Sequence, residues 1–409
     1  MKEILDIFKE LQNSESGYLE SQFKHIHWNK NVLYVNPQLN GRHFYKYILP
    51  YIVMYEFDGW ATALTSIDKY KPNKEYELVK IPLDSKQILW ADLIVLPFTY
   101  FNMKDIYSKI RMINPNIKIV FNVDFNYYQL SKNHPLHSIF SLPENISNIE
   151  DNIFYSDLTY VTNVKLCEVL IEKFENELNN NKYKDVFSNV HIGTLPIFTD
   201  KDLILGNITE ELVPLTPEEK EPLRIGIVAT NYTWEDINSY KDLLKEVKEK
   251  LGNKVKFISI GFDGIDHFTQ KSCFPDNLDF EYIKPSTIVH YFKQLRNLQL
   301  DMMFIPLRVN EFNMTSENYN KLLEAGLFNI PVMVYNIYPY SEMIKNGDTG
   351  ILLSTKKEFV ERIEFFEKNR EELKRIGENA HNYVIENFNY TEEFVSIIDE
   401  IYTLEENEE

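Results

Sequence analysis

Cysteine is scarce in this sequence, with only Cys167 and Cys273 among 409 residues. Two cysteines cannot make a disulfide framework, so reduced thiols in a cytoplasmic protein are the simplest expectation. No stretch approaches about 18 consecutive apolar residues, which predicts that no helix spans a membrane. The opening residues, MKEILDIFKELQNSESG, lack the basic and then apolar pattern of a secretory signal.

Basic side chains are also in the minority. Lys and Arg total 43 against 62 Asp and Glu, which gives a net charge of −19. Non-specific binding of nucleic acid usually relies on an overall positive field, and this chain does not have one. A local basic groove stays compatible with the composition.

Several catalytic signatures are missing as well. There is no Gly-x-Ser-x-Gly nucleophile elbow and no phosphate-binding Gly-Lys-Ser/Thr loop. The stretch 261–264 has two glycines but lacks the third glycine of a dinucleotide fingerprint. The nine histidines show no paired spacing typical of metal ligands, so no metal site is predicted.

What the first half does contain is an alternation of short apolar runs with longer amphipathic ones. Runs rich in β-branched residues predict buried strands, and apolar residues at helical spacing predict helices at 105–113 and 165–178. The predicted strands are 32–35, 93–98, 118–123, 158–162 and 189–196. This alternation is typical of a doubly wound parallel sheet with crossover helices.

The second half repeats the pattern after a stretch with prolines at 214, 217 and 222. Strands are predicted at 224–230, 255–261, 300–307, 331–335 and 350–353. Helices are predicted at 236–251, 286–297, 316–328, 356–368 and 370–387. The fold class is therefore α/β, with two Rossmann-like doubly wound domains that face a cleft.

The predicted division places a helical extension at 1–28, a first domain at 29–205 and a linker at 206–222, then a second domain at 223–386 and a C-terminal helix with an acidic tail at 387–409. An apolar stripe on the extension favours docking on the first domain, with recruitment of a partner as the alternative.

The most informative stretch is 300–355. A polar loop at 308–315 leads into a predicted helix that begins near Ser316, and free N–H groups at a helix start favour an anion such as a diphosphate. Lys321 and Glu324 lie on one face of this helix, where they suit a diphosphate and ribose hydroxyls. A plain surface ion pair is the alternative, and spacing alone favours it.

The same stretch resembles the nucleotide-sugar half of GT-B glycosyltransferases, especially the retaining family-four group (glycosyl transferases group 1). The resemblance runs nearly without gaps to about residue 388. It rests on Asp301 with Pro306–Leu307, Phe312–Asn313, Lys321 with Glu324, Pro331–Val332, Pro339–Tyr340, and Asn346–Gly347 with Gly350.

The sequence departs from that family in two places. The family's pair of glutamates eight residues apart would need Glu at Ser316, where Glu317 is adjacent, and its early Arg and Lys have no clear counterpart. The segment after the first strand instead leads to Asp236. The resemblance then assigns the diphosphate to Lys321, Arg308, Lys241, Lys46 or backbone groups near Thr230–Asn231. The residues that it assigns to the donor site as a whole are Glu324, Lys321, Arg308, Phe312, Asn313, Thr230, Asn231 and Ser316.

A fainter resemblance covers the first half. Gly41, Tyr45 and Lys46 resemble a Gly-x-x-Tyr-Tyr-Arg loop of a branch that includes phage-encoded enzymes, with Lys46 in place of arginine. Asp124 matches an aspartate at a strand end in that branch, although a capping or turn role is about equally expected. His134 is an acceptor-site candidate or a plain loop residue. The resemblance makes Asp124, Lys46 and Lys321 catalytic, and Gly41, Tyr45 and His134 acceptor-binding.

The resemblance implies a cytoplasmic glycosyltransferase, bacterial or phage-encoded, that moves a hexose or pentose from a nucleotide diphosphate such as UDP to an acceptor hydroxyl with retention. Lys321, Lys46 and Arg308 would stabilise the leaving diphosphate, so no metal or other cofactor is expected. The acceptor is a glycan or, second, a hydroxylated base in phage-type DNA. Aromatics, 14% of the chain, suggest stacking platforms, although core packing accounts for most. A non-catalytic nucleotide-sugar-binding protein and an epimerase of this fold are the rival hypotheses.

Overall fold

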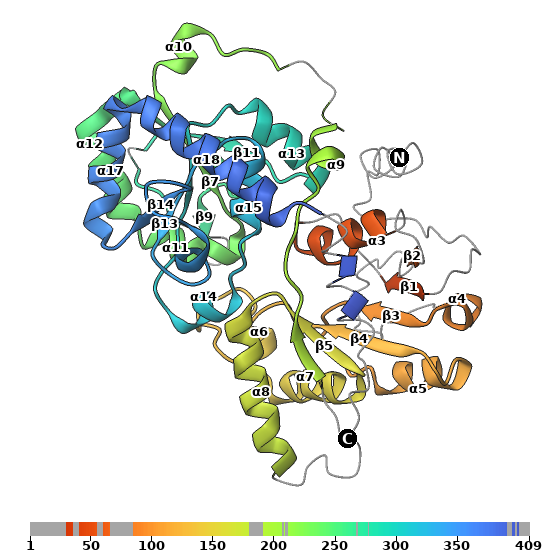
Figure 1. Ribbon diagram of the computed structural model, residues 1–409. Helices are drawn as coiled ribbons and strands as arrows, with labels where there is room; N and C mark the ends of the chain where they lie inside the picture. Colours follow the sequence, from red (N-terminus) through yellow and green to blue (C-terminus); the bar gives the residue numbers. More distant parts are fainter. Residues whose placement is uncertain are drawn as a thin grey trace. The chain divides into compact units, whose positions relative to one another are not determined.

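Two six-stranded parallel sheets organise the chain in the computed structural model (Figure 1). The structure describes residues 30–35, 41–54, 60–65, 85–179, 191–206, 208, 212–266, 269–276, 278–390, 395–396 and 399–400. It divides into unit 1 (Met1–Tyr128, Ser138–Ile197 and Tyr390–Glu409) and unit 2 (Gln129–His137 and Phe198–Asn389). The two Rossmann-like domains predicted from the alternating pattern are confirmed. The proposed extension at 1–28 and most of the acidic tail lie outside the described residues.

The sheet of unit 1 has the order β2-β1-β3-β4-β5-β6. Its strands are β1 (Lys30–Val35), β2 (Trp60–Thr65), β3 (Leu93–Leu96), β4 (Lys118–Asn122), β5 (Leu158–Val161) and β6 (His191–Thr194). Its helical segments are α2 (Gly41–His43), η1 (Phe44–Ile48), α3 (Leu49–Met54), α4 (Ser85–Trp90), α5 (Lys104–Ile113), α6 (His137–Phe140), α7 (Pro143–Tyr155) and α8 (Val164–Asn179). All five predicted strands are present, and β2 is the one that the sequence analysis missed.

The sheet of unit 2 has the order β11-β8-β7-β12-β13-β14. Its strands are β7 (Leu223–Val228), β8 (Val255–Ile260), β11 (Phe280–Ile283), β12 (Met302–Ile305), β13 (Val332–Tyr335) and β14 (Ile351–Leu353), beside a hairpin of β9 (Ile265–Asp266) and β10 (Lys271–Ser272). Renumbered within the unit, this is the 3-2-1-4-5-6 order of a dinucleotide-binding fold. The strand order therefore reverses direction between the neighbouring strands β7 and β12, which is called the winding reversal below. Ligands of such folds bind at that point, outside the carboxyl ends of the strands.

The helical segments of unit 2 are α9 (Lys201–Gly206), α10 (Pro217–Lys220), η2 (Asn231–Thr233), α11 (Trp234–Asn238), α12 (Lys241–Leu251), η3 (Gly252–Lys254), α13 (Ile288–Asn297), α14 (Glu311–Ser316), α15 (Asn320–Leu327), α16 (Tyr340–Met343), α17 (Lys356–Lys368) and α18 (Arg370–Phe388). The segment expected as a linker, 206–222, includes α10 and is held to unit 2, because Arg370 donates to the carbonyls of Lys220 and Glu221.

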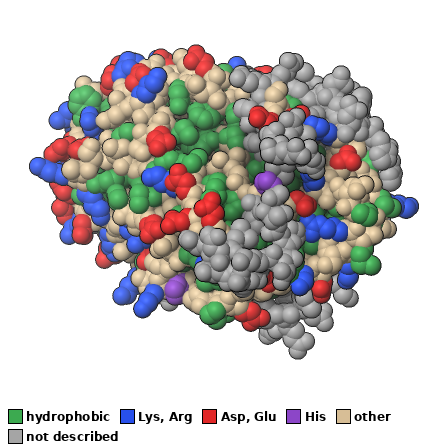
Figure 2. Space-filling model, turned by 60° about the horizontal axis from the view of Figure 1, so that its bottom comes forward, with side chains coloured by type: hydrophobic (Ala, Val, Ile, Leu, Met, Phe, Trp, Pro, Cys, Tyr) green, Lys and Arg blue, Asp and Glu red, His purple; other side chains and the backbone are tan. Residues whose placement is uncertain are grey.

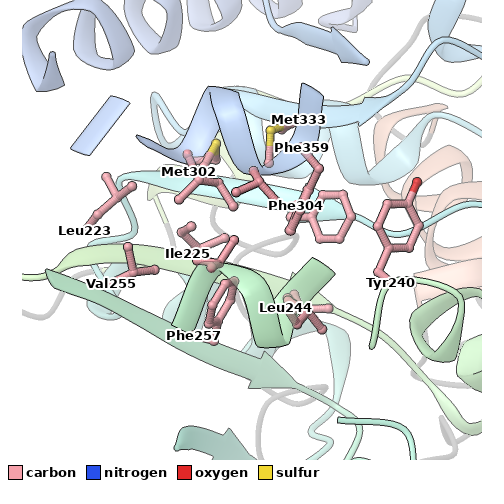
Figure 3. Close-up of a cluster of buried hydrophobic side chains, with 14 of the residues drawn as sticks. Leu223, Ile225, Tyr240, Leu244, Val255, Phe257, Met302, Phe304, Met333 and Phe359 are labelled. Atoms are coloured by element: carbon pink, nitrogen blue, oxygen red, sulfur yellow. The ribbon is translucent and has the colours of Figure 1, made fainter. Parts of the chain in front are cut away.

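The core of unit 2 lies between one face of its sheet and the helices α12 and α17 (Figure 3). Ile225, Phe257 and Phe304 come from three neighbouring strands, and Leu244 and Phe359 come from the two helices. Each of these side chains is at most 2% exposed. Burying a side chain of this size contributes about 1.5–3 kcal/mol, so this layer fixes the positions of β7 and β12.

Helix α15 packs closely against α18. A Cβ on Gly326 would lie 2.6 Å from Cγ2 of Val384, and a Cβ on Gly377 would lie 2.1 Å from the carbonyl oxygen of Asn329. Only glycine permits the two backbones to approach so closely. The arrangement positions α15, which carries Lys321 and Glu324.

Candidate functional site

Two helix predictions near the site are wrong in detail. The helix expected at 316–328 begins only at Asn320, because Glu317 takes extended backbone angles (φ −74°, ψ 145°) and separates α14 from α15. Ser316 therefore ends α14 and does not begin a helix. The expected loop at 308–315 is helical from Glu311, where the side chain of Asn310 caps α14 by accepting the N–H of Asn313 at 2.7 Å.

A buried carboxylate holds the loop after β12. Asp236 is 5% exposed, and its Oδ1 accepts three hydrogen bonds, from the backbone N–H of Arg308 at 3.0 Å, from Nε of Arg308 at 2.9 Å and from Nδ2 of Asn313 at 2.9 Å. Burial raises the pKa of Asp236, while Arg308 and Asn313 act in the opposite direction. Asp236 therefore joins α11, which follows β7, to the loop after β12 at the winding reversal.

A second carboxylate shares the same arginine. Nη2 of Arg308 donates to Oε2 of Glu235 at 2.9 Å, and the hydroxyl of Ser131 donates to the same oxygen at 2.6 Å. Burial opposes the ionisation of Glu235, but the hydrogen bond from Ser131 and the charge of Arg308 outweigh it and lower the pKa of Glu235. Two carboxylates thus face one guanidinium, which leaves the cluster with a net negative charge and reduces the attraction of Arg308 for a diphosphate.

Three rings meet beside this cluster. The ring of His134 stacks on Tyr232 with centroids 5.9 Å apart and an interplanar angle of 17°, and it lies 5.3 Å from the ring of Phe312. Nδ1 of His134 accepts the backbone N–H of Leu136 at 3.1 Å. The structure thus brings together His134 and Phe312, which the sequence analysis assigned separately to the acceptor and the donor.

Thr230 and Asn231 follow β7 at the same edge of the sheet. Thr230 caps the 3₁₀ turn η2, since its hydroxyl accepts the N–H of Tyr232 at 3.3 Å and its own N–H donates to the hydroxyl of Thr233 at 3.1 Å. Much of the backbone here is therefore hydrogen-bonded within the turn. Lys241 donates to the carbonyl of Ser272 at 2.9 Å, in the region of the β9–β10 hairpin.

Lys321 pairs with a residue that the sequence analysis noted only as a neighbour of Ser316. Its Nζ lies 2.6 Å from Oε1 of Glu317, and both side chains are 17% exposed. The hydroxyl of Tyr340 donates to the same Oε1 at 3.3 Å and to the carbonyl of Asn318 at 3.0 Å. Burial raises the pKa of Tyr340 well above its usual range, so the phenol stays a donor. An ammonium has three N–H groups, and Glu317 accepts from one of them.

Glu324 is a buried residue rather than one half of a surface pair with Lys321. It is 2% exposed, Oε2 accepts from the hydroxyl of Tyr291 at 2.9 Å, and Oε1 accepts from Nδ2 of Asn320 at 2.8 Å. Burial and the nearby carboxylate raise the pKa of Tyr291 well above its usual range. The simple surface ion pair that spacing favoured is therefore wrong.

The first-half candidates belong to unit 1. Lys46 lies in the π-helical turn η1, and its Nζ is 2.7 Å from Oδ1 of Asp124, two residues beyond β4. The two side chains are 3% and 6% exposed, so this is a buried ion pair with little access for a ligand. Gly41 begins α2, and Tyr45 lies in the interior, edge-on to Phe44.

The sequence analysis missed Ser131, Tyr232 and Glu235, and did not identify Tyr291 and Tyr340 as partners of the acidic residues. Tyr340 itself had been named in the resemblance, and Tyr232 and Glu235 adjoin the named residues Asn231 and Asp236, so a local signal existed for these three. Among the described residues, no group of three His, Cys, Asp or Glu side chains is arranged to hold a metal ion. None of the helices in the described part of the chain is long and apolar enough to cross a bilayer.

Comparison with known proteins adds a family match for the second unit. Residues 210–383 match the family model described as Glycosyl transferases group 1, which is somewhat less than half of the chain. No curated protein matches the sequence. The family match and the fold together support a glycosyltransferase.

Solved structures resemble the whole described architecture. An α-glucosyltransferase (AGT) in complex with UDP gives a TM-score of 0.62 at 12% identity over 91% of this chain and 99% of that chain. The N-terminal domain of trehalose-6-phosphate phosphatase from Candida albicans gives 0.61 at 12% identity over 95% and 99%. Anabaena Alr3699/HepE in complex with UDP-glucose gives 0.55 at 12% identity over 92% and 99%.

The chain spans 54% of the length of a further match, TarM, with a TM-score of 0.47 at 14% identity over 76% of this chain. At these identities the likeness concerns the fold. The predicted GT-B fold with two Rossmann-like domains is confirmed.

Proposed function

We propose that the protein is a glycosyltransferase that moves a sugar from a UDP-sugar to an acceptor hydroxyl, with retention of configuration at the sugar. The observation that carries the proposal is the group 1 family match over residues 210–383, the unit in which Asp236, Arg308 and Asn313 meet where the sheet reverses its winding. AGT with UDP and HepE with UDP-glucose share the fold and support UDP as the nucleotide.

Lys321 is the cation best suited to the leaving diphosphate. Charge develops on the diphosphate as the bond to the sugar breaks, and a preorganised cation beside it lowers the barrier. Glu317 accepts one N–H of Lys321 and holds the ammonium in place, which leaves N–H groups for phosphate oxygens. Arg308 has two carboxylate partners, so its contribution to the diphosphate is the smaller one.

Glu324 suits the ribose. Tyr291 and Asn320 orient its carboxylate, since Oε2 accepts from the hydroxyl of Tyr291 and Oε1 accepts from Nδ2 of Asn320. Because Glu324 is 2% exposed, ribose binding requires a shift of one of these two partners. Lys46 and Asp124 are too deeply buried for a direct contact in this proposal, and we assign them to holding η1 against the end of β4.

A donor panel tests the proposal. The protein is incubated with UDP-glucose, UDP-galactose, UDP-N-acetylglucosamine and GDP-mannose, with and without methyl glycosides as acceptors, and release of nucleoside diphosphate is measured. We expect release from at least one UDP-sugar and a loss in kcat/KM of about 10²-fold or more in Lys321→Ala, the usual cost of removing one transition-state donor. Lys357→Ala is the matched control, since Lys357 forms an exposed pair with Glu361 at 3.5 Å.

Two outcomes would contradict the proposal. A nucleotide sugar that binds but never releases its diphosphate, with or without acceptor, would identify a binding protein. A sugar whose configuration changes at a ring carbon without any acceptor would identify an epimerase.

A further inference from the structure

A segment from the first half of the sequence packs on unit 2. Gln129–His137 interrupts the stretch that builds unit 1 and forms a compact part with Phe198–Asn389. Ser131 bonds to Glu235 at 2.6 Å, and His134 meets Tyr232 and Phe312. This segment therefore completes a surface that the family-matched part of the chain does not form alone.

The three rings make an aromatic surface with one exposed member. His134 covers a face of the Tyr232 ring, yet Tyr232 is still 49% exposed. No hydrogen bond to the Tyr232 hydroxyl is found among the residues that the structure describes. About half of the Tyr232 side chain therefore stays accessible to a ligand.

One ring nitrogen of His134 is held by the backbone. Nδ1 of His134 accepts the backbone N–H of Leu136, so a neutral imidazole carries its proton on Nε2. Asn231 is an exposed amide that precedes Tyr232 in sequence, whereas the side chain of Asn133 is hydrogen-bonded to Glu235. An aromatic face next to hydrogen-bonding side chains suits a molecule with one C–H face and a rim of hydroxyls.

The charge of the segments that carry the three rings does not favour a nucleic-acid backbone. The segments 129–137, 230–236 and 308–312 together carry two basic side chains, Lys132 and Arg308, and three acidic ones, Glu235, Asp236 and Glu311. Both described partners of the Arg308 side chain are carboxylates. Figure 2 shows basic and acidic side chains interspersed on one face of the molecule. A polyphosphate backbone needs clustered cations, and an uncharged saccharide does not.

We propose that Tyr232, with His134 and Phe312 beneath it, is the acceptor platform of the enzyme and that it stacks an uncharged pyranose ring. The inference rests on the proposed function, because a platform at the winding reversal lies at the same sheet edge as the donor residues. It selects the glycan over the DNA base as acceptor. The acceptor hydroxyl would replace the diphosphate at the anomeric carbon, and its proton would leave with the diphosphate.

Saturation-transfer NMR with simple saccharides tests the platform. The probes are the methyl glycosides of glucose, galactose and N-acetylglucosamine, each mixed with the full chain. We expect saturation of the ring C–H protons of at least one probe, a drop of at least threefold in Tyr232→Ala, and retention in Tyr232→Phe, which keeps the ring. Tyr282→Ala is the matched control, because Tyr282 is a 39% exposed tyrosine on β11 of the same unit.

The results separate the two proposals. Any of three results would overturn the platform. The first is equal saturation in wild type and Tyr232→Ala, and the second is no saturation of any probe. The third is binding of a 12-base-pair duplex that Tyr232→Ala weakens. Release of UDP from a UDP-sugar by the wild type decides the proposed function independently. Circular dichroism of both Tyr232 variants checks that they fold, and a folded Tyr232→Phe that loses the saturation would also contradict stacking.

Discussion

At the scale of single residues, a charged pair in the interior of unit 1 constrains the fold more than the chemistry. The resemblance of the first half to the branch with phage-encoded enzymes predicted that Lys46 and Asp124 are catalytic. The pair is real, at 2.7 Å, but its side chains are only 3% and 6% exposed. The two residue types can be read from the sequence. The burial of their side chains depends on tertiary packing, which no local sequence pattern shows.

Removal of one partner of this pair should be costly. Lys46→Met leaves the Asp124 carboxylate buried without its cation, and breaking such a pair costs about 3–5 kcal/mol. We expect the urea midpoint of unit 1 to fall accordingly, and the double variant Lys46→Met with Asp124→Leu to recover part of the loss. A midpoint equal to wild type in Lys46→Met would show that the pair is not buried as described.

The contrast between Lys321 and Glu324 shows what spacing can and cannot predict. Three residues apart on a helix, they were expected on one face, and both indeed lie on α15. Spacing also covers Glu317 and Asn320, which stand four residues before Lys321 and Glu324 respectively. It could not reveal Tyr291, which reaches Glu324 from α13, because only the fold brings residues 33 positions apart together.

At the scale of elements, the buried strands were the most predictable part. Runs of β-branched and aromatic residues bounded by turn formers marked ten of the strands, because a strand covered on both faces is apolar throughout. The break between α14 and α15 was missed even though Asn310 precedes Glu311, a usual capping pattern for a helix start. The expected helix 236–251 is likewise divided, at Ser239 and Tyr240. Tyr240 is fully buried, where its hydroxyl bonds to the carbonyl of Leu307 at 3.1 Å.

The close packing of α15 on α18 leads to a prediction about stability. A methyl group at position 377 would lie 2.1 Å from a backbone oxygen that cannot rotate away, so Gly377→Ala must push the helices apart. Overpacking of this kind costs about 1–3 kcal/mol and should lower the thermal midpoint of unit 2. Gly206→Ala is the matched control, since a Cβ there meets nothing within 4 Å. A normal midpoint in Gly377→Ala would contradict the close approach.

At the scale of the whole molecule, the order of elements along the chain was enough to predict two doubly wound domains. It could not predict that Gln129–His137 would join unit 2, because that depends on contacts between residues about a hundred positions apart, such as Ser131 and Glu235. The same long-range contacts place His134 beside Phe312. The helices and strands of the candidate site were therefore predictable, whereas the contacts between distant segments that assemble the site were not.

The central claim is that unit 2 binds the diphosphate of a nucleotide sugar through Lys321 at the start of α15. Calorimetric titration of UDP into wild type, Lys321→Ala and Lys357→Ala tests it most directly. The account predicts binding by wild type and Lys357→Ala and an affinity about tenfold or more lower in Lys321→Ala, since a charged hydrogen bond contributes about 1.5–3 kcal/mol. Equal affinities in all three proteins, or no binding of UDP by the wild type, would contradict it.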